Sequence, residues 1–554
     1  MNVAEFLQLR AQQQPDAIAV AEPIQGRWRN RNLPLEKRYH CLTFQELDED
    51  STRLAAGLHA MQVEQGSRLA LMIPPSCEFI SWVFALFKAG MITVLIDPGM
   101  GRKNIINSLQ RVETEGFIGI SKVQAVRTIL RHKFPTAKKN VTVGRRWFWG
   151  GPTSQKLRRT PLDNFELFKP QATDPAAIIF TTGSTGPPKG VHYCHQNFYH
   201  QVLQIQEQYQ IQPGERDLPA FPLFGLFNAA MGVTTILPEM DPTKPALVTP
   251  QNIIMPIQDW EVTQSFGSPA LWETVGRYCS EHDVTMPSLK RILSAGAPVP
   301  PRVLQRMRDA MASDGDMHTP YGATESLPVA TISASEVLSE TAEKTDAGHG
   351  TCVGANFSGI EWKVIKIRDD ELRDIEDTIE LVPGEIGELI VRGPVVTSHY
   401  VTHEKETRLH KIKDGSGFWH RMGDVGYFDQ TGRFWFCGRK SHRVQLPQKT
   451  LFTIPTEALI NLHPRIYRSA VVQVDNQGIS EAAIVVECWP DNKPSSPTDK
   501  EQLLSELKQL ASENDLTSVI THFLVRDALP VDIRHNAKIF REKISVWAQK
   551  KLGL

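Results

Sequence analysis

A short glycine-rich stretch behind an apolar run constrains this chain more than any other feature. Residues 178–190 read IIFTTGSTGPPKG, so three apolar residues are followed by hydroxyl residues, glycines and a lysine. Glycine lets neighbouring N–H groups point into one concavity, and hydroxyls and a lysine add donors for phosphate. The pattern predicts a strand that ends in a polyphosphate-binding loop, formed by Thr181, Thr182, Gly183, Ser184, Thr185, Gly186 and Lys189.

This loop differs from a Walker A motif at two positions. Pro188 stands where that motif requires a glycine, and Gly190 replaces the metal-binding Ser or Thr. A surface turn rich in Gly, Pro and Thr is the alternative interpretation. The apolar run in front of the loop favours phosphate binding over this alternative, as do the ten consecutive residues 181–190, which all suit a phosphate-binding loop.

Residues 181–190 resemble the signature loop of the adenylate-forming superfamily, which includes acyl-CoA synthetases, luciferases and the adenylation domains of peptide synthetases. Segments similar to further motifs of that family follow in the same order, so the resemblance covers nearly the whole chain. They are SAGAPVP (294–300), YGATE (321–325), GELIVRG (387–393), HRMGDVGYFDQTGRFWFCGR (420–439) and NAKI (536–539).

The fold class that we expect is α/β. At 554 residues the chain exceeds what one hydrophobic core usually serves. Strand–helix–strand spacing over the first 100 residues, including a capping-box pattern at Thr43 and Glu46, predicts parallel sheet with helices on its faces. Short β-like runs between 351 and 437 predict an antiparallel subdomain. The polar segments 333–349 and 490–500 predict a surface excursion and a loop.

We therefore expect two domains and a hinge. Residues 1–437 form a large N-terminal domain of α/β layers that binds ATP and an acyl substrate. Polarity rises at residues 438–443, which are the expected hinge. Residues 444–554 have strand and helix patterns on the scale of one small, mobile α+β C-terminal domain, as the resemblance also implies.

Composition favours a cytoplasmic protein. Hydrophobic and charged contents of 41% and 22% are ordinary for a globular chain, and a formal net charge of −1 gives no overall attraction to nucleic acid. The seven cysteines are scattered without a CxxC pair, which favours reduced thiols. The N-terminus lacks the pattern of a signal peptide, and Lys88 and Gly90 interrupt the apolar stretch 79–96. That stretch predicts a buried helix leading into a strand.

One segment is strongly basic. Residues 121–160 contain eleven Lys and Arg, no Asp or Glu, and the aromatic cluster GRRWFWGG at 144–151. A membrane surface, an acidic carrier protein or a partner enzyme could dock there. The alternative is a solvated insertion whose charge is offset elsewhere. Because no nucleic-acid-binding motif accompanies the segment, nucleic acid is not an expected partner.

The resemblance implies ATP and Mg²⁺ as cofactors. In the family's first reaction a carboxylate attacks ATP, which releases pyrophosphate and leaves an acyl-adenylate. The matching positions assign Glu325 to Mg²⁺, and carboxylates with phosphate oxygens are ordinary Mg²⁺ ligands. By the same matching, Tyr321 packs on the adenine and Gly322 and Thr324 belong to the phosphate-contacting motif. Gly296, Ala297 and Pro298 line the adenine pocket, and Asp424 and Arg439 contact the ribose.

The catalytic residues implied by the resemblance are Lys538, Glu325, Thr185 and Lys189. Lys538 matches a lysine of the family's C-terminal domain that bridges the substrate carboxylate and the α-phosphate. Domain closure would bring it into the site only after the substrates bind. The usual Ser-Gly before this lysine is Asn536-Ala537 here. His195 also matches a family position, where we expect a structural role.

The second half-reaction is where the chain departs from most relatives. Ser441 and His442 occupy acidic positions of the linker motif, and Gln448 stands where a glycine lines the thiol's approach. The chain also resembles the β-lactone synthetases of bacterial long-chain olefin biosynthesis. These convert 2-alkyl-3-hydroxy fatty acids to β-lactones and work with thiolase, reductase and lactone-decarboxylase partners. The apolar run that could hold the alkyl chain, or be plain core, contains Phe221, Leu223, Phe224 and Phe227.

Two other functions remain open. The changes in the linker could be neutral drift, and the chain would then be a medium- or long-chain acyl-CoA synthetase. A non-catalytic scaffold that binds a nucleotide or an acyl group is the alternative from another class. Retention of Glu325, Asp424 and Lys538 argues against the scaffold.

Overall fold

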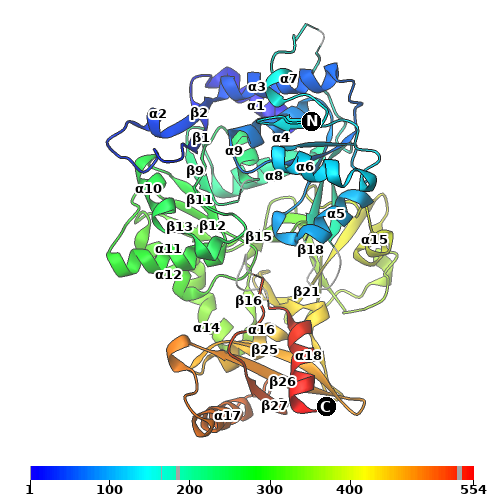
Figure 1. The fold of residues 1–554 in the computed structure, drawn as a ribbon. Coiled ribbons are helices and arrows are strands. Elements are labelled where there is room, and N and C mark those ends of the chain that lie inside the picture. The colour runs from blue at the N-terminus through cyan, green and yellow to red at the C-terminus, as the bar shows by residue number, and fades with distance from the viewer. Residues whose placement is uncertain (1, 164, 182–187, 222, 533–538) are drawn as a thin grey trace.

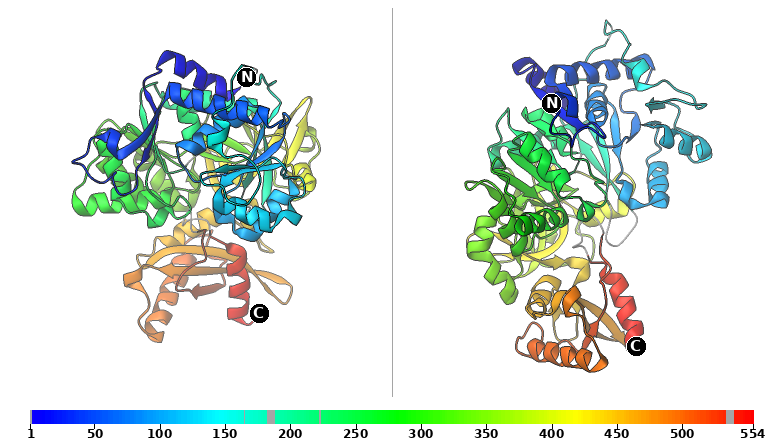
Figure 2. Two further views of the ribbon diagram at one scale, coloured as in Figure 1. Left: turned by 45° about the horizontal axis from the view of Figure 1, so that its top comes forward. Right: turned by 60° about the vertical axis from the view of Figure 1, so that its left-hand side comes forward.

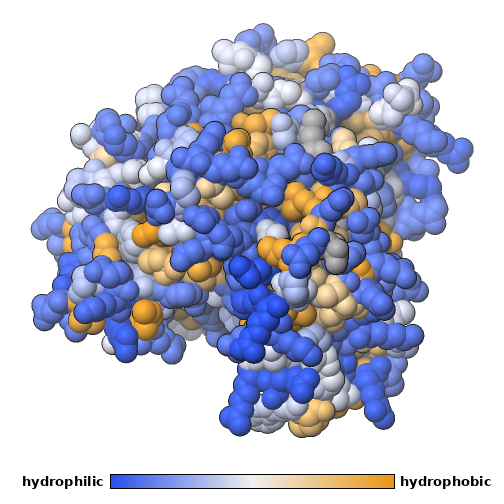
Figure 3. Space-filling model, turned by 90° about the horizontal axis from the view of Figure 1, so that it is seen from above, coloured by the Kyte–Doolittle hydropathy of each residue, from blue (hydrophilic) through white to orange (hydrophobic). Residues whose placement is uncertain are grey.

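The structure is a computed structural model that describes residues 2–163, 165–181, 188–221, 223–532 and 539–554. Figure 1 shows a large upper lobe, coloured blue to yellow, and a smaller lower lobe that carries the orange and red C-terminal part of the chain. The two further views show the same separation of the lobes (Figure 2). Seen from above, the surface is mostly hydrophilic, with small hydrophobic patches scattered over it (Figure 3).

Two mainly parallel sheets form much of the upper lobe. Their strand orders are β13-β12-β11-β9-β10-β1-β2 and β6-β5-β3-β4-β7-β8. Among the described strands of these two sheets, only the terminal pairs β1–β2 and β7–β8 are antiparallel. The strands of the first sheet are β13 (Asp316–His318), β12 (Arg291–Ser294), β11 (Gln264–Gly267), β9 (Arg216–Pro219), β10 (Thr234–Ile236), β1 (Ile18–Pro23) and β2 (Tyr39–Thr43). Those of the second are β6 (Val141–Val143), β5 (Gly116–Ile120), β3 (Arg68–Met72), β4 (Ile92–Leu95), β7 (Pro175–Thr181) and β8 (Lys189–Cys194).

Helix α4 (Cys77–Lys88) lies between these two sheets. It contacts β1 and β2 of one sheet and β4 of the other, and every residue in it except Glu78 is buried. A helix that is apolar all round needs such an environment. Lys88, fully buried, donates from Nζ to Asp48 Oδ1 at 2.6 Å on α3 (Phe44–Ala60). The predicted buried helix and strand are confirmed, as is the capping box at the start of α3.

The other helices of the upper lobe cover the sheets or connect their strands. They are α1 (Val3–Gln13), α2 (Leu35–Arg38), α5 (Arg102–Arg111), α6 (Ser121–Ile129), α7 (Ser154–Leu157), α8 (His195–Tyr209), α9 (Phe224–Met231), α10 (Gln251–Asp259), α11 (Pro269–His282), α12 (Pro301–Ala310) and α15 (Glu404–His410). Among the described residues, no helix combines the length and the apolar character that crossing a membrane requires.

The predicted antiparallel subdomain is confirmed. Its sheet has the order β16-β22-β21-β19-β18, with β20 paired to β21, and a second antiparallel sheet has the order β14-β15-β17. The strands are β16 (Thr351–Cys352), β22 (Phe434–Arg439), β21 (Gly417–Phe428), β19 (Gly387–Arg392), β18 (Glu361–Ile365), β20 (Lys411–Asp414), β14 (Tyr321–Ala323), β15 (Ser326–Thr331) and β17 (Ala355–Asn356).

The lower lobe is built around one three-stranded sheet. Along β25, Val471 belongs to one buried apolar cluster, while Ala470 and Val472 belong to another, so both faces of the sheet are covered. The strands are β25 (Ile466–Asn476), β26 (Ile479–Cys488) and β27 (His522–Val525), with the short pair β23 (Val444–Gln445) and β24 (Thr450–Leu451). The helices are α16 (Thr453–Asn461), α17 (Pro497–Ser512) and α18 (Arg541–Leu552). This α+β arrangement agrees with the expected fold class.

Two polar segments differ from their predictions. Residues 333–349, predicted as a surface excursion, contain α13 (Ala334–Glu336), α14 (Ala342–Lys344) and π-helical turns that contact α16. The predicted loop at 490–500 is wrong over its last residues, because α17 begins at Pro497. Ser496 accepts a hydrogen bond from the Asp499 N–H, and proline favours the first helical position, so this polar run starts a helix.

Candidate active site

Strand pairing brings together the residues predicted to bind the nucleoside. Asp424 on β21 is the cross-strand partner of Arg439 on β22, and Arg439 Nη1 lies 2.9 Å from Asp424 Oδ1. Tyr321, on β14, donates from its hydroxyl to Asp424 Oδ2 at 2.5 Å. Burial and the neighbouring Asp424 raise the pKa of Tyr321 well above its usual value, and Asp424 raises the pKa of Arg439. Both carboxylate oxygens thus already have partners, which a ribose diol would have to replace or join.

A second group of contacts holds Glu325 in place. Its Oε1 accepts a hydrogen bond from the Tyr400 hydroxyl at 2.7 Å, and its main-chain carbonyl accepts from the Thr397 N–H at 2.9 Å. The neighbouring Thr324 carbonyl accepts from the Tyr193 hydroxyl at 2.5 Å. Burial and the adjacent Glu325 raise the pKa of Tyr400, so this tyrosine acts as a donor. These contacts fix both the backbone and the carboxylate of Glu325.

A partly buried lysine lies near Glu325. Lys411 donates from Nζ to the Thr397 carbonyl, and its side chain passes 5.1 Å from the centre of the Phe418 ring. Burial lowers the pKa of Lys411 to about 7, and the negative charge of Glu325 opposes that shift. Lys411 therefore holds Thr397, whose N–H donates to the Glu325 carbonyl.

Lys189 stands at the end of the phosphate-loop hairpin. Thr181 and Lys189 are cross-strand partners on β7 and β8, so the two ends of the loop are held together. Lys189 Nζ lies 2.5 Å from Glu406 Oε2 and 5.2 Å from the centre of the Tyr400 ring. Burial would raise the pKa of Glu406, but its hydrogen bond and charge interaction with Lys189 outweigh burial and lower it. The lysine predicted to meet phosphate is thus already paired with a carboxylate.

Other predicted residues lie at the edge of the sheet or outside the described chain. Gly296 (φ +99°), Ala297 and Pro298 follow β12, which is parallel to β13, the strand before Tyr321 and Gly322. Because parallel neighbours end at the same edge, both segments leave the sheet on one side. A Cβ on Gly322 would meet the Ser326 carbonyl oxygen at 2.7 Å. The predictions that fall outside the described residues concern Thr182, Gly183, Ser184, Thr185, Gly186 and Lys538.

A single carboxylate is what the described residues offer to Mg²⁺. In the described ranges no group of three or more His, Cys, Asp or Glu side chains is arranged to hold a metal ion. Mg²⁺ commonly binds one or two carboxylates and completes its shell with water and substrate phosphates. Glu325 fits that mode of binding. Tyr400 holds its carboxylate by a hydrogen bond, and the Tyr400 ring also lies against Lys189.

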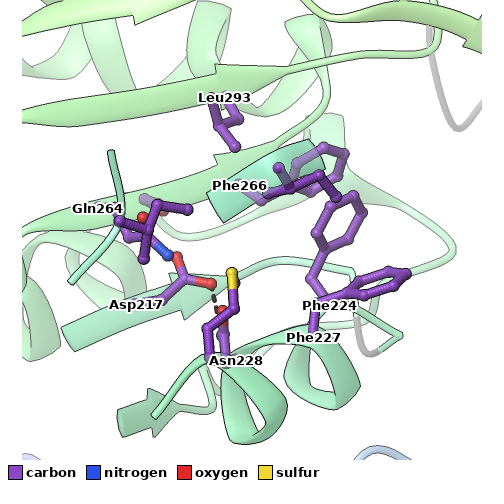
Figure 4. Close-up of a pocket in the computed structure, with 11 residues that line it drawn as sticks. Asp217, Phe224, Phe227, Asn228, Gln264, Phe266 and Leu293 are labelled. Atoms are coloured by element: carbon purple, nitrogen blue, oxygen red, sulfur yellow. Dashed lines mark hydrogen bonds between the residues drawn. The ribbon is translucent and has the colours of Figure 1, made fainter. Parts of the chain in front are cut away.

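Two of the four residues predicted to hold the acyl chain line a cavity. Phe224 and Phe227 line a small apolar cavity between α9 and the sheet, where the Phe224 ring stacks on Phe266 with centroids 3.8 Å apart (Figure 4). Phe221 and Leu223 are absent from its described lining. Phe221 is 45% exposed before α9, and Leu223 packs against the main core.

Sequence analysis missed the polar side of this cavity. Asp217 and Asn228 face it, and Asn228 Nδ2 donates to Asp217 Oδ2 at 2.6 Å (Figure 4). Burial raises the pKa of Asp217 to about 7, although the Asn228 hydrogen bond opposes the shift. Tyr400, Glu406 and Lys411 were also missed, because each meets its partner only through tertiary contacts. The predicted structural role of His195 agrees with its buried position 5.8 Å from the Phe87 ring.

Known proteins resemble this chain over its whole length. The olefin beta-lactone synthetase of Xanthomonas campestris pv. campestris is 40% identical over 556 residues, covering 99% of this chain and 98% of the relative. That of Stenotrophomonas maltophilia is 41% identical and covers 100% and 98%. The 2-succinylbenzoate–CoA ligase of Bacillus licheniformis is 23% identical over 98% of this chain and 100% of the ligase.

Solved structures share the fold. The amide bond synthetase McbA from Marinactinospora thermotolerans has a TM-score of 0.78 at 19% identity and covers 99% of each chain. The O-succinylbenzoate coenzyme A synthetase from Bacillus subtilis in complex with AMP has a TM-score of 0.73 at 21% identity and covers 97% of each chain. The model of the family described as AMP-binding enzyme matches residues 7–401. The chain therefore belongs to the AMP-binding enzyme family, in which its sequence is similar to the olefin beta-lactone synthetases along its entire length.

Proposed function

We propose that this chain is an AMP-forming ligase that acts as an olefin beta-lactone synthetase. The observation that carries the proposal is the 40% and 41% identity to two such enzymes over nearly every residue. The CoA ligases of Bacillus licheniformis and Escherichia coli reach 23% and 24%. The contacts of the candidate site, Glu325 with Tyr400 and Asp424 with Arg439, support catalysis over a scaffold role.

The reaction has two steps. A carboxylate oxygen of a long-chain 2-alkyl-3-hydroxy fatty acid attacks the α-phosphorus of ATP, and pyrophosphate leaves. The 3-hydroxyl oxygen then attacks the acyl carbon, the bond from that carbon to the AMP oxygen breaks, and the hydroxyl proton passes to solvent or AMP. The products are a β-lactone and AMP. Because the second step is intramolecular, effective molarity offsets part of the strain of the four-membered ring.

The proposed roles follow the site. Lys189 and residues 181–186 bind the β- and γ-phosphates, Tyr321 and residues 296–298 hold the adenine, and Asp424 with Arg439 holds the ribose. Glu325 would hold Mg²⁺, which neutralises phosphate charge when bound. Lys538 bridges the carboxylate and α-phosphate.

The proposed domain limits are 1–437, a hinge at 438–443, and 444–554. The enzyme is proposed to be cytoplasmic, to work with thiolase, reductase and lactone-decarboxylase partners, and to contact a membrane surface through residues 121–160.

Product analysis tests the proposal. The protein is incubated with ATP, Mg²⁺ and a racemic 2-alkyl-3-hydroxy acid, with and without coenzyme A. We expect β-lactone and AMP in equal amounts without coenzyme A. A thioester formed only with coenzyme A would instead assign an acyl-CoA synthetase, and the absence of AMP under all conditions would assign a scaffold.

The assignment of Lys538 has its own prediction. Lys538→Ala should nearly abolish pyrophosphate release, because the bridging ammonium would be lost from the transition state. Lys550→Ala, on an exposed position of α18, is the matched control and should retain activity. Pyrophosphate release near the wild-type rate in the Lys538 variant would remove this assignment.

A further inference from the structure

The basic segment 121–160 carries charge that the protein itself does not neutralise. Of its eleven Lys and Arg, Arg158 is the one with an ion pair, to Asp50 and Glu78, among the described residues. A solvated insertion whose charge is offset by acidic neighbours would show more such pairs. Seven of the basic residues are exposed: Lys122, Arg131, Lys138, Arg145, Arg146, Lys156 and Arg159.

An aromatic loop tip accompanies this charge. Trp147 is 61% exposed and Phe148 is 80% exposed, whereas Trp149 is buried and donates from its indole nitrogen to Thr142 Oγ1 at 2.9 Å. The Trp147 ring stacks on Trp149 with centroids 6.0 Å apart. Arg146 Nη1 donates to the Gly151 carbonyl at 2.8 Å across the base of the loop. Trp149 thus fixes the loop while two large apolar side chains stand in solvent.

The neighbouring helix exposes apolar residues as well. On α6, Ile129 is 76% exposed and Val126 is 48% exposed, on the same helical face as Lys122. The Ser121 hydroxyl donates to the Arg145 carbonyl, so the helix start is tied to the loop. Strand β6, which leads into the loop, is the edge strand next to β5, which leads into α6. The right-hand view of Figure 2 places α6 and β6 at the outer margin of the upper lobe.

We propose that this surface docks on an anionic lipid bilayer. Trp147 and Phe148 enter the interfacial region, Ile129 and Val126 follow, and the exposed lysines and arginines pair with lipid phosphates. Scattered single apolar residues are ordinary on a protein surface (Figure 3), but aromatic tips surrounded by unneutralised cations are typical of interfacial anchors. The apolar side chains protrude from a tip and a helix, which favours a bilayer over an acidic protein. The proposal does not depend on which reaction the enzyme catalyses.

Vesicle flotation tests the docking surface. The full chain is mixed with phosphatidylcholine vesicles with or without phosphatidylglycerol, and its bound fraction is measured against lipid concentration. We expect binding that needs the anionic lipid and weakens with salt, because surface attraction is screened. Trp147→Ala/Phe148→Ala and Arg145→Glu/Arg146→Glu should each lower the partition coefficient at least about tenfold.

Controls separate docking from damage to the fold. Leu247→Ala, which removes a side chain that is 75% exposed elsewhere, should bind vesicles like the wild type. Pyrophosphate release with detergent-dispersed substrate should be unchanged in all these variants. The proposal is overturned if the wild type stays unbound at millimolar anionic lipid, or if the Trp147/Phe148 variant binds as well as the wild type. Capture by an acidic protein without affinity for vesicles would likewise overturn it.

Discussion

At the scale of single residues, the proposed nucleotide site is held by groups that already have partners. Tyr400 orients Glu325, and Tyr321 and Arg439 occupy Asp424. Preorganised groups lose little freedom when charge develops in a reaction, which is the main way that an enzyme stabilises a transition state electrostatically. Substitution of the residue that orients each carboxylate is therefore as informative as substitution of the carboxylate itself.

Tyr400→Phe tests how much the orientation of Glu325 matters. The change removes the hydroxyl that donates to Oε1 at 2.7 Å and keeps the ring beside Lys189. A hydrogen bond to a charged group is worth about 1.5–3 kcal/mol, so we expect the Mg²⁺ concentration for half-maximal pyrophosphate release to rise about tenfold. Tyr209→Phe, which removes a donor to Thr331 Oγ1, is the control and should leave Mg²⁺ dependence nearly unchanged. Equal Mg²⁺ dependence in both variants would contradict this role.

Asp217 gives a prediction on stability and pH. Burial raises its pKa from 3.8 to about 7, so the folded protein holds a proton that the unfolded chain has released. Its contribution to stability is therefore complete below about pH 4 and is lost as pH rises toward 7, by up to about 4 kcal/mol. Asp217→Asn cannot ionise and should raise the melting temperature at about pH 8 more than at about pH 5. Thermal unfolding at both values measures this, with the exposed Glu281→Gln as control. An equal shift at both pH values would show that Asp217 stays ionised.

At the scale of elements, α15 places a carboxylate against the phosphate-loop hairpin. Its Glu406 pairs with Lys189 on β8, a residue 217 positions earlier, while Tyr400 just before the helix pairs with Glu325. With Lys189 in its proposed role, the polyphosphate of ATP must compete with Glu406 for this lysine. The helix therefore acts on nucleotide affinity without being part of the loop.

Glu406→Gln tests that competition. The amide can still accept a hydrogen bond from Lys189 but carries no charge, so we expect the KM for ATP to fall about fivefold. Glu404→Gln on the same helix, where the carboxylate is exposed and faces Arg408, is the matched control and should leave the KM unchanged. Steady-state pyrophosphate release over a range of ATP concentrations distinguishes the two. A rise in KM for Glu406→Gln would mean that the carboxylate positions Lys189 for ATP.

At the scale of the whole molecule, local pattern predicted the elements but not the contacts between them. The buried helix and strand of residues 79–96 and the strand before the phosphate loop were predictable, because composition and spacing within a few residues determine them. The Tyr321–Asp424 hydrogen bond joins residues 103 positions apart, so no nearby pattern indicates it. The polar composition of 333–349 predicted a surface excursion. This prediction was wrong because short helical turns that pack against α16 need apolar residues on one face only. Asp217 appeared to be an ordinary charged residue until the fold buried it.

The junction of the lobes gives the last prediction. Gly438 on β22 has φ +134°, and a Cβ there would lie 2.3 Å from Thr453 Oγ1, at the start of α16. Gly432, in the β21–β22 turn, has φ +81° and open space around it. Both Gly→Ala changes strain the backbone, more at Gly438 because its φ lies beyond the left-handed region, but only Gly438→Ala also pushes on the lower lobe.

We expect Gly438→Ala to lower pyrophosphate release at least about tenfold and to speed proteolysis at 440–449, because a displaced lobe would misplace the lysine that we propose to be catalytic. Gly432→Ala should lose some thermal stability but keep its activity and protease resistance. Thr453→Ala, which removes the opposing oxygen, should partly restore activity when combined with Gly438→Ala. If the two glycine variants behave alike, backbone strain alone accounts for the loss, and the contact between β22 and α16 does not set the position of the lower lobe.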